Sequence, residues 1–185
     1  MNAVEPISKK SDIERMKKAL GNPRDKLLFI FGINSALRIS DILSLKVGDV
    51  RGKDSLAIKE TKTRKSKRFK LNPAIQKAVR ELVPAEADDN APLFPSRRRS
   101  KSGEHKAITR VQAWRLLNEA ADRAGVNVEI GTHTLRKTMA YHAYKSGVDI
   151  ALLMNVLNHS SQRETLRYIG VTQDQVNDVF ESINL

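Results

Sequence analysis

The stretch HTLRKTMAYH, residues 133–142, places a histidine and an arginine three positions apart where a helix is predicted to begin. Residues at i and i+3 share one helical face, so His133 and Arg136 are expected to lie side by side. The first turn of a helix favours an anion through its free N–H groups and its macrodipole. Neither side chain is favoured there on dipole grounds, and a bound phosphate would account for both. An ordinary pair of surface residues is the alternative.

The composition points to a polyanionic partner. The 185 residues include 33 Lys and Arg against 21 Asp and Glu, a net charge of +12, and the pI is about 10.1. Nucleic acid is the first candidate and an anionic membrane the second. The longest apolar run, LLFIFGI, is far shorter than the roughly 18 residues of a spanning helix. The N-terminus also lacks the apolar core of a signal peptide, so we expect a cytoplasmic protein without a membrane partner.

The inventory of reactive side chains excludes several kinds of site. The chain has no cysteine, which rules out disulfides, thiolate zinc sites and a thiol nucleophile. Its four histidines lack the spacing of metal ligands. We therefore predict that the protein uses no metal and no cofactor.

Capping signals divide most of the chain into short helices. Capping boxes are predicted to begin helices at Ser11, Thr109, Ser161 and Thr172. Further helix starts are predicted at Asn22-Pro23, Ser40, Asn72-Pro73, Thr132 or Thr134, and Asp149. SLAIKE and KRFKL are predicted strands joined by the polar turn TKTRKS, and residues 84–106 are predicted to form a loop. The expected fold class is mainly α with one small antiparallel β-sheet (α+β).

An arginine stands between two apolar segments in SALRISDILSL, residues 35–45. A surface arginine would be out of place there, which draws attention to Arg38. Asp41 follows at i+3 and would be close enough to hold the arginine if the turn is helical. A structural ion pair and a functional arginine are equally good interpretations of this fragment.

The turn of the predicted hairpin is densely basic. A solvated charge run is the usual explanation for a sequence such as TKTRKSKR, residues 61–68. A basic turn can also reach into a groove of DNA, where Lys and Arg contacts to phosphate supply most sequence-independent affinity. The residues that we expect to contact DNA in this way are Lys59, Arg64, Lys65, Lys67 and Arg68.

The stretch LLMNVLNHSSQRETLRYIG, residues 152–170, contains a histidine and a tyrosine of interest. His159 follows a predicted helix end, and Tyr168 lies on the next helix. Taken singly, such a histidine is more often a cap and such a tyrosine more often belongs to a core or an interface.

In this order the motifs resemble the catalytic set of the tyrosine recombinases, the phage-integrase family, from about residue 8 to the end. ALRISDILSL resembles the first arginine motif, HTLRKT the His-x-x-Arg motif and LNHSSQRETLRYI the last motif. The family more often has Leu-Gly-His in that last motif, where this chain has Asn158. The resemblance implies the tyrosine-recombinase catalytic-domain fold, with residues 1–185 forming a single catalytic domain. Most members place a core-binding domain before it, and its absence here would fit either a minimal recombinase or an excised domain.

The resemblance also implies a phosphate-binding and nucleophilic centre. Tyr168 would attack a DNA phosphodiester. Arg38 and Arg136 would bind the non-bridging oxygens through bidentate hydrogen bonds. Asp41 would support Arg38.

The remaining implied roles concern protons. Lys62 would be the general acid for the leaving 5′-oxygen, although the hairpin register leaves Lys59, Lys65 and Lys67 as alternatives. His133 would act as acid or base near the tyrosine, and His159 would hydrogen-bond the phosphate.

These roles imply a site-specific recombinase that cleaves and rejoins DNA through a 3′-phosphotyrosyl intermediate, with no requirement for metal or ATP. The alternatives are a nicking–closing enzyme like the type IB topoisomerases and a non-catalytic regulator derived from an integrase. Target sequence, and the choice among integration, excision, inversion and resolution, stay open.

Double-stranded DNA is the expected partner, and self-association as a tetramer on DNA is expected with it. An accessory DNA-bending or core-binding protein is a further candidate partner. The apolar residues Val176, Val179, Phe180 and Ile183 form a stripe on a predicted C-terminal helix at about 172–183. This helix would dock on a neighbouring protomer, or alternatively on its own domain.

Overall fold

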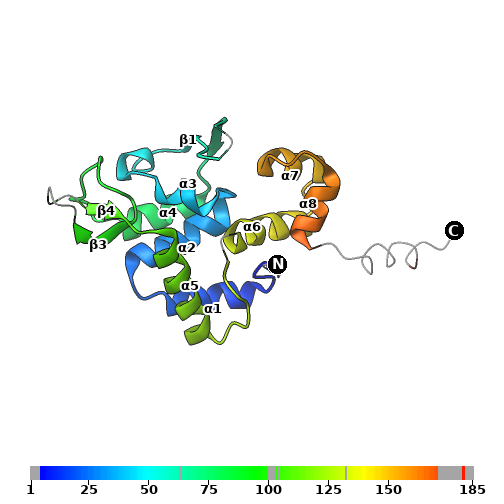
Figure 1. Ribbon diagram of the computed structural model, residues 1–185, viewed down its shortest axis with the longest axis horizontal. Coiled ribbons are helices and arrows are strands. Elements are labelled where there is room, and N and C mark those ends of the chain that lie inside the picture. The colour runs from blue at the N-terminus through cyan, green and yellow to red at the C-terminus, as the bar shows by residue number, and fades with distance from the viewer. Residues whose placement is uncertain are drawn as a thin grey trace.

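A computed structural model describes residues 5–62, 64–99, 103, 105–131, 133–170 and 181 (Figure 1). Helices dominate, and two antiparallel pairs of strands occur in this part of the chain. The elements are α1 (Lys10–Ala19), α2 (Pro23–Ser35), α3 (Ile39–Leu43), a 3₁₀ turn (Val47–Asp49), β1 (Ser55–Lys59), β2 (Ser66–Lys70), α4 (Pro73–Leu82), β3 (Pro95–Arg99), β4 (His105–Ala107), α5 (Arg110–Ala124), α6 (Thr134–Lys145), α7 (Ile150–Leu157) and α8 (Gln162–Ile169). The mainly-α prediction is confirmed.

Four of the predicted helix starts are confirmed by side-chain caps. Asn22 accepts a hydrogen bond from the Arg24 amide, and Asn72 accepts one from the Ile75 amide, each just before a proline in the first turn. Thr109 and Gln112 form the full reciprocal capping box of α5. Asp149 accepts from two amides at the start of α7. These contacts satisfy backbone donors that a helix leaves unpaired at its N-terminus.

Other predicted caps are wrong or only half right. Helix α1 begins at Lys10, so Ser11 already lies inside it. Helix α3 begins at Ile39 because Arg38 has the extended backbone of an N-cap, which places Ser40 within the helix. Ser161 does cap α8 by accepting from the Glu164 amide. The Glu164 carboxylate, however, bonds the amide and hydroxyl of Ser160 and does not close the box.

Strand pairing is confirmed for the first hairpin and corrects the prediction for residues 84–106. In β1–β2, Ser55 pairs with Lys70 and Lys59 with Ser66. Residues 84–106 are not all loop, because β3 pairs antiparallel with β4 through an irregular register. The sequence of β3, PSRRR, has neither β-branched residues nor alternation, so its composition gave no strand signal.

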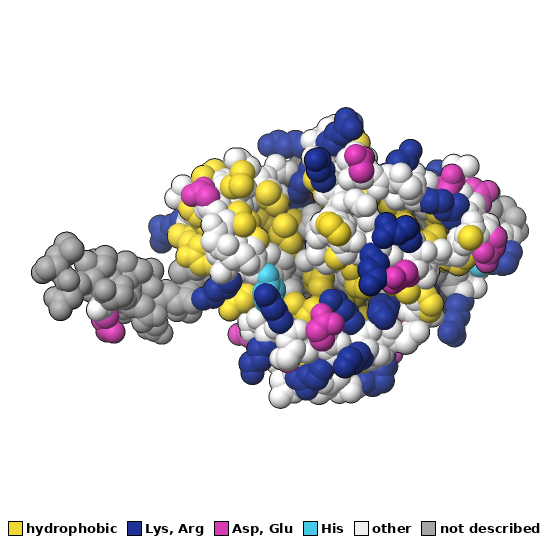
Figure 2. Space-filling view, turned by 180° about the vertical axis from the view of Figure 1, so that it is seen from behind, with side chains coloured by type: hydrophobic (Ala, Val, Ile, Leu, Met, Phe, Trp, Pro, Cys, Tyr) yellow, Lys and Arg dark blue, Asp and Glu magenta, His cyan; other side chains and the backbone are white. Residues whose placement is uncertain are grey.

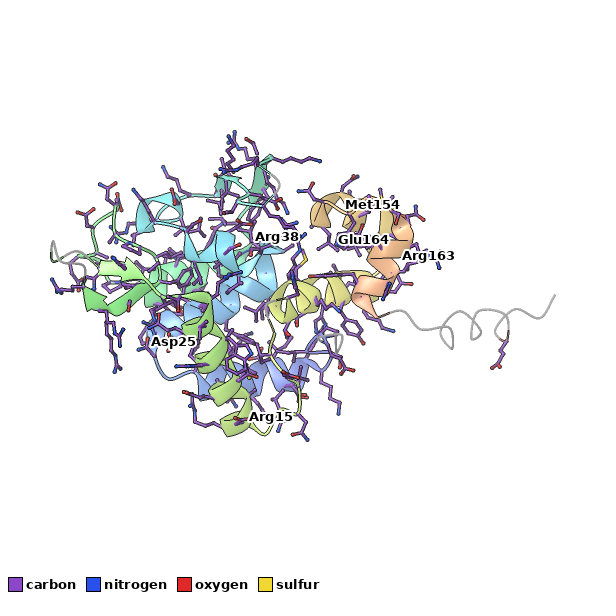
Figure 3. The ribbon with its side chains drawn as sticks, in the orientation of Figure 1. Arg15, Asp25, Arg38, Met154, Arg163 and Glu164 are labelled. Atoms are coloured by element: carbon purple, nitrogen blue, oxygen red, sulfur yellow. The ribbon has the colours of Figure 1, made fainter. Side chains whose placement is uncertain are left out.

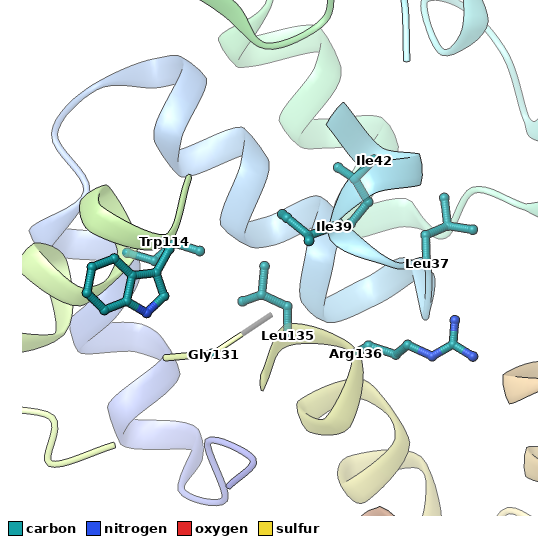
Figure 4. Close-up of a pocket in the computed structure, with 8 residues that line it drawn as sticks. Leu37, Ile39, Ile42, Trp114, Gly131, Leu135 and Arg136 are labelled. Atoms are coloured by element: carbon teal, nitrogen blue, oxygen red, sulfur yellow. The ribbon is translucent and has the colours of Figure 1, made fainter. Parts of the chain in front are cut away.

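Helix α2 lies at the centre of the fold and contributes to two apolar cores. Its buried residues contribute to one core under the β1–β2 hairpin and α4, and to a second core with α1 and α5. Helix α6 crosses α2 so closely that a Cβ on Gly32 would collide with the Leu135 side chain. Leu135 points toward Ile39, with which it lines a small apolar pocket, while Arg136 extends away from the apolar side chains of this pocket (Figure 4).

Helices α7 and α8 form a separate small core with α6, containing Ala36, Ala140, Leu157 and Ile169. In Figure 1 they lie at one end of the molecule, beyond α6. The predicted C-terminal helix at about 172–183 lies outside the described residues, apart from Glu181. Among the helices that are described, none has the length and apolar character needed to cross a bilayer.

We predict that Gly32→Ala lowers the free energy of unfolding by about 1–3 kcal/mol, the usual cost of overpacking a tight contact. Denaturant titration measures this change. Gly21→Ala is the matched control, because a Cβ there meets no atom within 4 Å. Equal stability of the Gly32 variant and the wild type would show that α2 and α6 separate without cost.

Candidate active site

Side chains from distant parts of the sequence converge where the β1–β2 hairpin, the start of α3 and the start of α6 face α7 and α8. Arg38 lies on the side of the main body that faces α7 and α8 (Figure 3). Arg136 and Lys67 bond carbonyl groups at the end of α7. The structure thus brings close together five of the residues that the sequence analysis names, Arg38, Arg136, His133, His159 and Tyr168.

Two fully buried carboxylates lie among these cations. Glu60 Oε2 accepts a hydrogen bond of 2.9 Å from Arg38 Nη1, and the Glu60 side chain has 0% exposure. Asp41 is equally buried, and its Oδ1 accepts from the Thr61 amide at 2.9 Å. The salt bridge of Arg38 is therefore formed with Glu60, whereas Asp41 fixes the start of the hairpin turn. Arg38 precedes α3 in an extended conformation, so the i,i+3 geometry of a helix does not apply to it.

The C-terminus of α7 receives two of the cations. Arg136, only 3% exposed, donates from Nη2 to the Leu157 carbonyl. Lys67 Nζ donates to the Val156 carbonyl at 2.7 Å. The last carbonyls of a helix lack partners within the helix, and they carry the negative end of its dipole. Burial lowers the pKa of Lys67, the charge of Arg136 lowers it further, and Glu60 partly opposes the change.

Tyr168 is enclosed by cationic and titratable side chains. Its ring lies edge-on to His159, with centroids 4.9 Å apart, and to His133, at 6.3 Å. Lys137 Nζ lies 5.1 Å from the ring centroid. The hydroxyl is buried, and burial raises the pKa of Tyr168 to about 12. Arg136 opposes the rise by its charge and by a side-chain contact that falls short of hydrogen-bond geometry.

Both histidines of the site favour the neutral form. Burial is the largest cause of the lowered pKa of His133, followed by the charges of Arg136 and Arg38. Burial also lowers the pKa of His159, where Glu164 acts in the opposite direction. The His159 Nδ1 lies 3.0 Å from Thr165 Oγ1, a contact that fixes the ring. Neutral imidazoles at pH 7 can accept a proton from a neighbouring acid.

The lysines of the hairpin fall into two groups. Lys62 is exposed in the turn, and its charge is among those that lower the pKa of His133. The other predicted DNA-contacting residues Lys59, Arg64, Lys65 and Arg68 are exposed as well. Lys67 differs, because it is half-buried and points into the site. Lys and Arg side chains are also spread over the face shown in Figure 2, so the positive charge extends beyond the hairpin.

Glu60 is the main site residue that the sequence prediction missed. A signal for it existed, because side chains at i, i+2 and i+4 of a strand share one face. Leu56 is buried and Ile58 half-buried, and the same alternation places Glu60 on the inward side. A charged residue on the buried face of a strand indicates a polar partner inside. Lys67 pairs with Ile58 across the hairpin, and so lies on this face too.

The donor set of the site is dominated by guanidinium and ammonium groups. No cluster of three or more His, Asp or Glu side chains suited to a metal ion occurs among the described residues. The chemistry that these groups can support directly is the binding of an anion.

Sequence and structure both relate the chain to known proteins. A profile of the phage integrase family matches residues 8–175. The chain is 47% identical over 176 residues to the probable integrase/recombinase YoeC of Bacillus subtilis (strain 168), covering 94% of this chain and 93% of that protein. It is 28% identical over 164 residues to the tyrosine recombinase XerA of Pyrococcus furiosus, covering 88% of this chain but 55% of XerA. The chain thus spans about half the length of that relative.

Two solved structures share the fold. The crystal structure of XerA recombinase superposes with a TM-score of 0.78 at 17% identity, covering 100% of this chain and 66% of that chain. XerH site-specific recombinase bound to its palindromic difH substrate, in a post-cleavage complex, gives 0.70 at 20% identity, with 98% and 54% covered. The expected catalytic-domain fold is confirmed.

We predict that Tyr168 stays protonated at pH 10, where an ordinary tyrosine is half ionised, because burial destabilises the phenolate. Since its folded pKa is raised, Tyr168 contributes stability that is fully present below pH 10 and is lost as the pH rises toward about 12. The ring-carbon NMR shift of labelled tyrosine measures the ionisation, and Tyr168→Phe assigns the signal. Half-ionisation of Tyr168 near pH 10 would contradict the burial of its hydroxyl.

Proposed function

The chain belongs to the phage integrase family, the tyrosine recombinases, and we propose that it is a site-specific recombinase that cleaves and rejoins DNA through a 3′-phosphotyrosyl intermediate at Tyr168. The observation that carries this proposal is the buried Tyr168 hydroxyl beside Arg136, with His133 and His159 against its ring. An isolated core tyrosine would have no need of two arginines and two histidines around it.

The arginines supply the binding of the phosphate. A guanidinium has five N–H donors in a planar fork, so Arg38 can bond Glu60 through one edge and still donate to an anion. Arg136 Nη1 is buried without a hydrogen-bond partner among the described residues, a costly state that a phosphate oxygen would relieve. Placed together, the two arginines would neutralise the charge that develops on the pentacoordinate phosphorus.

The histidines and a lysine supply the movement of protons. The Tyr168 oxygen attacks phosphorus and its proton passes to neutral His133, while His159 hydrogen-bonds the phosphate. The bond between phosphorus and the 5′-oxygen breaks, and Lys62 protonates the leaving oxygen. A 3′-phosphotyrosyl bond and a free 5′-hydroxyl result. Attack by a 5′-hydroxyl reverses each step and returns the proton to Tyr168, so rejoining consumes no ATP.

Two lysines compete for the role of general acid. Lys62 corresponds to the lysine that the family resemblance implies, and it lies close enough to His133 to affect its pKa. Lys67 lies deeper, and its lowered pKa would favour the release of its proton. Its ammonium group, however, is engaged with the Val156 carbonyl. We therefore keep Lys62 as the acid and assign Lys67 to holding the hairpin against α7.

Support for DNA as the substrate comes from charge and from the relatives. The net charge is +12, and the exposed hairpin residues are basic. XerH, which shares the fold, was solved on its DNA substrate. The presence of every catalytic residue type argues against a non-catalytic regulator, and the family relationship favours recombination over simple nicking and closing. Self-association through residues 172–183 on DNA, as a tetramer, is part of this proposal.

The decisive experiment detects a covalent adduct. Target DNA is first selected by binding from a random-sequence pool and then nicked in its spacer, so that the cleaved product cannot be rejoined. We expect the wild type to form a protein–DNA adduct in EDTA, and Tyr168→Phe to form none while binding DNA with unchanged affinity. Tyr141→Phe, whose ring packs on His142, is the matched control and should behave as wild type. Adduct formation by the Tyr168→Phe variant would assign the nucleophile elsewhere.

The general acid is tested with sulfur in place of the bridging 5′-oxygen. A thiol has a pKa of roughly 8.5, so a thiolate leaves without being protonated. We expect Lys62→Ala to be slower by about 10²- to 10⁴-fold on normal DNA, the usual contribution of general acid catalysis. On the sulfur substrate its rate should recover, whereas that of Lys67→Ala should not. Recovery of Lys67→Ala alone would move the acid to Lys67.

A further inference from the structure

Glu60 joins three segments that the proposed reaction depends on. Its Oε2 accepts 2.9 Å from Arg38 Nη1 and 3.0 Å from Asn158 Nδ2. Arg38 precedes α3, Glu60 follows β1, and Asn158 ends α7 immediately before His159. One buried carboxylate oxygen therefore links the phosphate-binding arginine, the base of the Lys62 turn and the backbone that carries His159.

Asn158 suits this link for two reasons. It is the C-cap of α7 and has the left-handed conformation, φ 52° and ψ 41°. Glycine is the usual residue in this conformation, and asparagine is the side chain that tolerates it best. A glycine would keep the same turn, but it would leave Glu60 without this donor. The asparagine thus adds a side-chain contact to a turn that the backbone could make alone.

The charges around Glu60 explain why a carboxylate is needed there. Arg38, Arg136 and Lys67 repel one another, and each of the two arginines lowers the pKa of Lys67. Glu60 acts in the opposite direction on both Lys67 and Arg136. A neutral side chain of the same shape would keep some hydrogen bonding but would leave the guanidinium of Arg38 less firmly oriented, because hydrogen bonds to charged groups are stronger than neutral ones.

We propose that Glu60 is a positioning residue for the cleavage step: it orients Arg38 toward the phosphate and, through Asn158, fixes the turn that presents His159. The inference rests on the proposed recombinase function. A purely structural role would make Glu60 matter for stability but leave the rate of cleavage at saturating DNA unchanged.

The test separates DNA binding, cleavage and stability in Glu60→Gln, which is isosteric, and in Asn158→Gly, which preserves the left-handed turn. At saturating target DNA, single-turnover adduct formation should slow about 10- to 100-fold in Glu60→Gln, the weight of one charged hydrogen bond. Asn158→Gly should slow it about 3- to 10-fold, the weight of a weaker bond to the same oxygen. DNA affinity should stay unchanged in both, because the exposed basic residues of the hairpin, which supply the phosphate contacts in the proposed function, are retained.

Two further readouts distinguish positioning from other roles. The double variant should be slower than Glu60→Gln alone by less than about 2-fold, because both changes break one network and their effects are not additive. The Glu60→Gln defect should also persist on the 5′-sulfur substrate, since Glu60 acts through the phosphate-binding Arg38 and not on the leaving group. The matched control is Glu81→Gln, an exposed residue of α4 paired with Lys77.

The outcomes are distinct. Wild-type rates in Glu60→Gln, with only a lower melting temperature, would overturn the positioning role while leaving the recombinase proposal intact. Full recovery of Glu60→Gln on the sulfur substrate would likewise overturn the action through Arg38. Absence of an adduct in the wild type and in Glu81→Gln would instead refute the proposed function, and the inference with it.

Discussion

The structure depends on holding cationic side chains together in a place where water cannot fully screen them. Arg136 is buried, Lys67 is half-buried, and Arg38 approaches both closely enough to lower the pKa of each. Like charges that lie this close together in a partly buried site destabilise the fold unless negative groups lie between them. The protein supplies those groups in two forms, the carboxylates of Asp41 and Glu60 and the C-terminal carbonyls of α7.

The charges of the two arginines also affect the pKa values of His133 and Tyr168. Burial is the largest cause of the lowered pKa of His133, and the charges of Arg136 and Arg38 lower it further, so the ring is neutral at pH 7. Burial raises the pKa of Tyr168 more than the charges of Arg136 and Arg38 lower it, so the phenol stays protonated. A protonated Tyr168 and an unprotonated His133 therefore lie next to each other in the site. An incoming phosphate would reduce the positive field and make His133 a better proton acceptor.

Local signals in the sequence were sufficient for most of the helices and for the first hairpin. The caps at Asn22, Asn72, Thr109 and Asp149 involve contacts within three residues, so no tertiary information is needed to predict them. The β3–β4 hairpin could not be predicted in this way. Its strand contains Arg97–Arg99, all exposed, and its pairing depends on how the surrounding chain brings it to β4.

The motifs of the candidate site could be predicted from the sequence. The hydrogen bonds and ion pairs that connect its residues could not. The order of Arg38, His133, Arg136, His159 and Tyr168 is visible in the sequence because family motifs are local. The partner of Arg38 was not visible, since it depends on where the hairpin crosses the start of α3. The register of that hairpin also decides which lysine points inward, and a shift by one residue would reverse every side chain.

Asn158 is a departure from the family pattern whose contact with Glu60 is visible only in the structure. In the sequence it replaces a glycine before His159 and removes no reactive group. In the structure its backbone keeps the glycine-like turn, and its side chain reaches Glu60, 98 positions away. Because the same carboxylate oxygen bonds Arg38, a substitution at either end changes the surroundings of an arginine and a histidine together. Residues 60 and 158 therefore form one functional unit, and the effect of either on the site depends on the identity of the other.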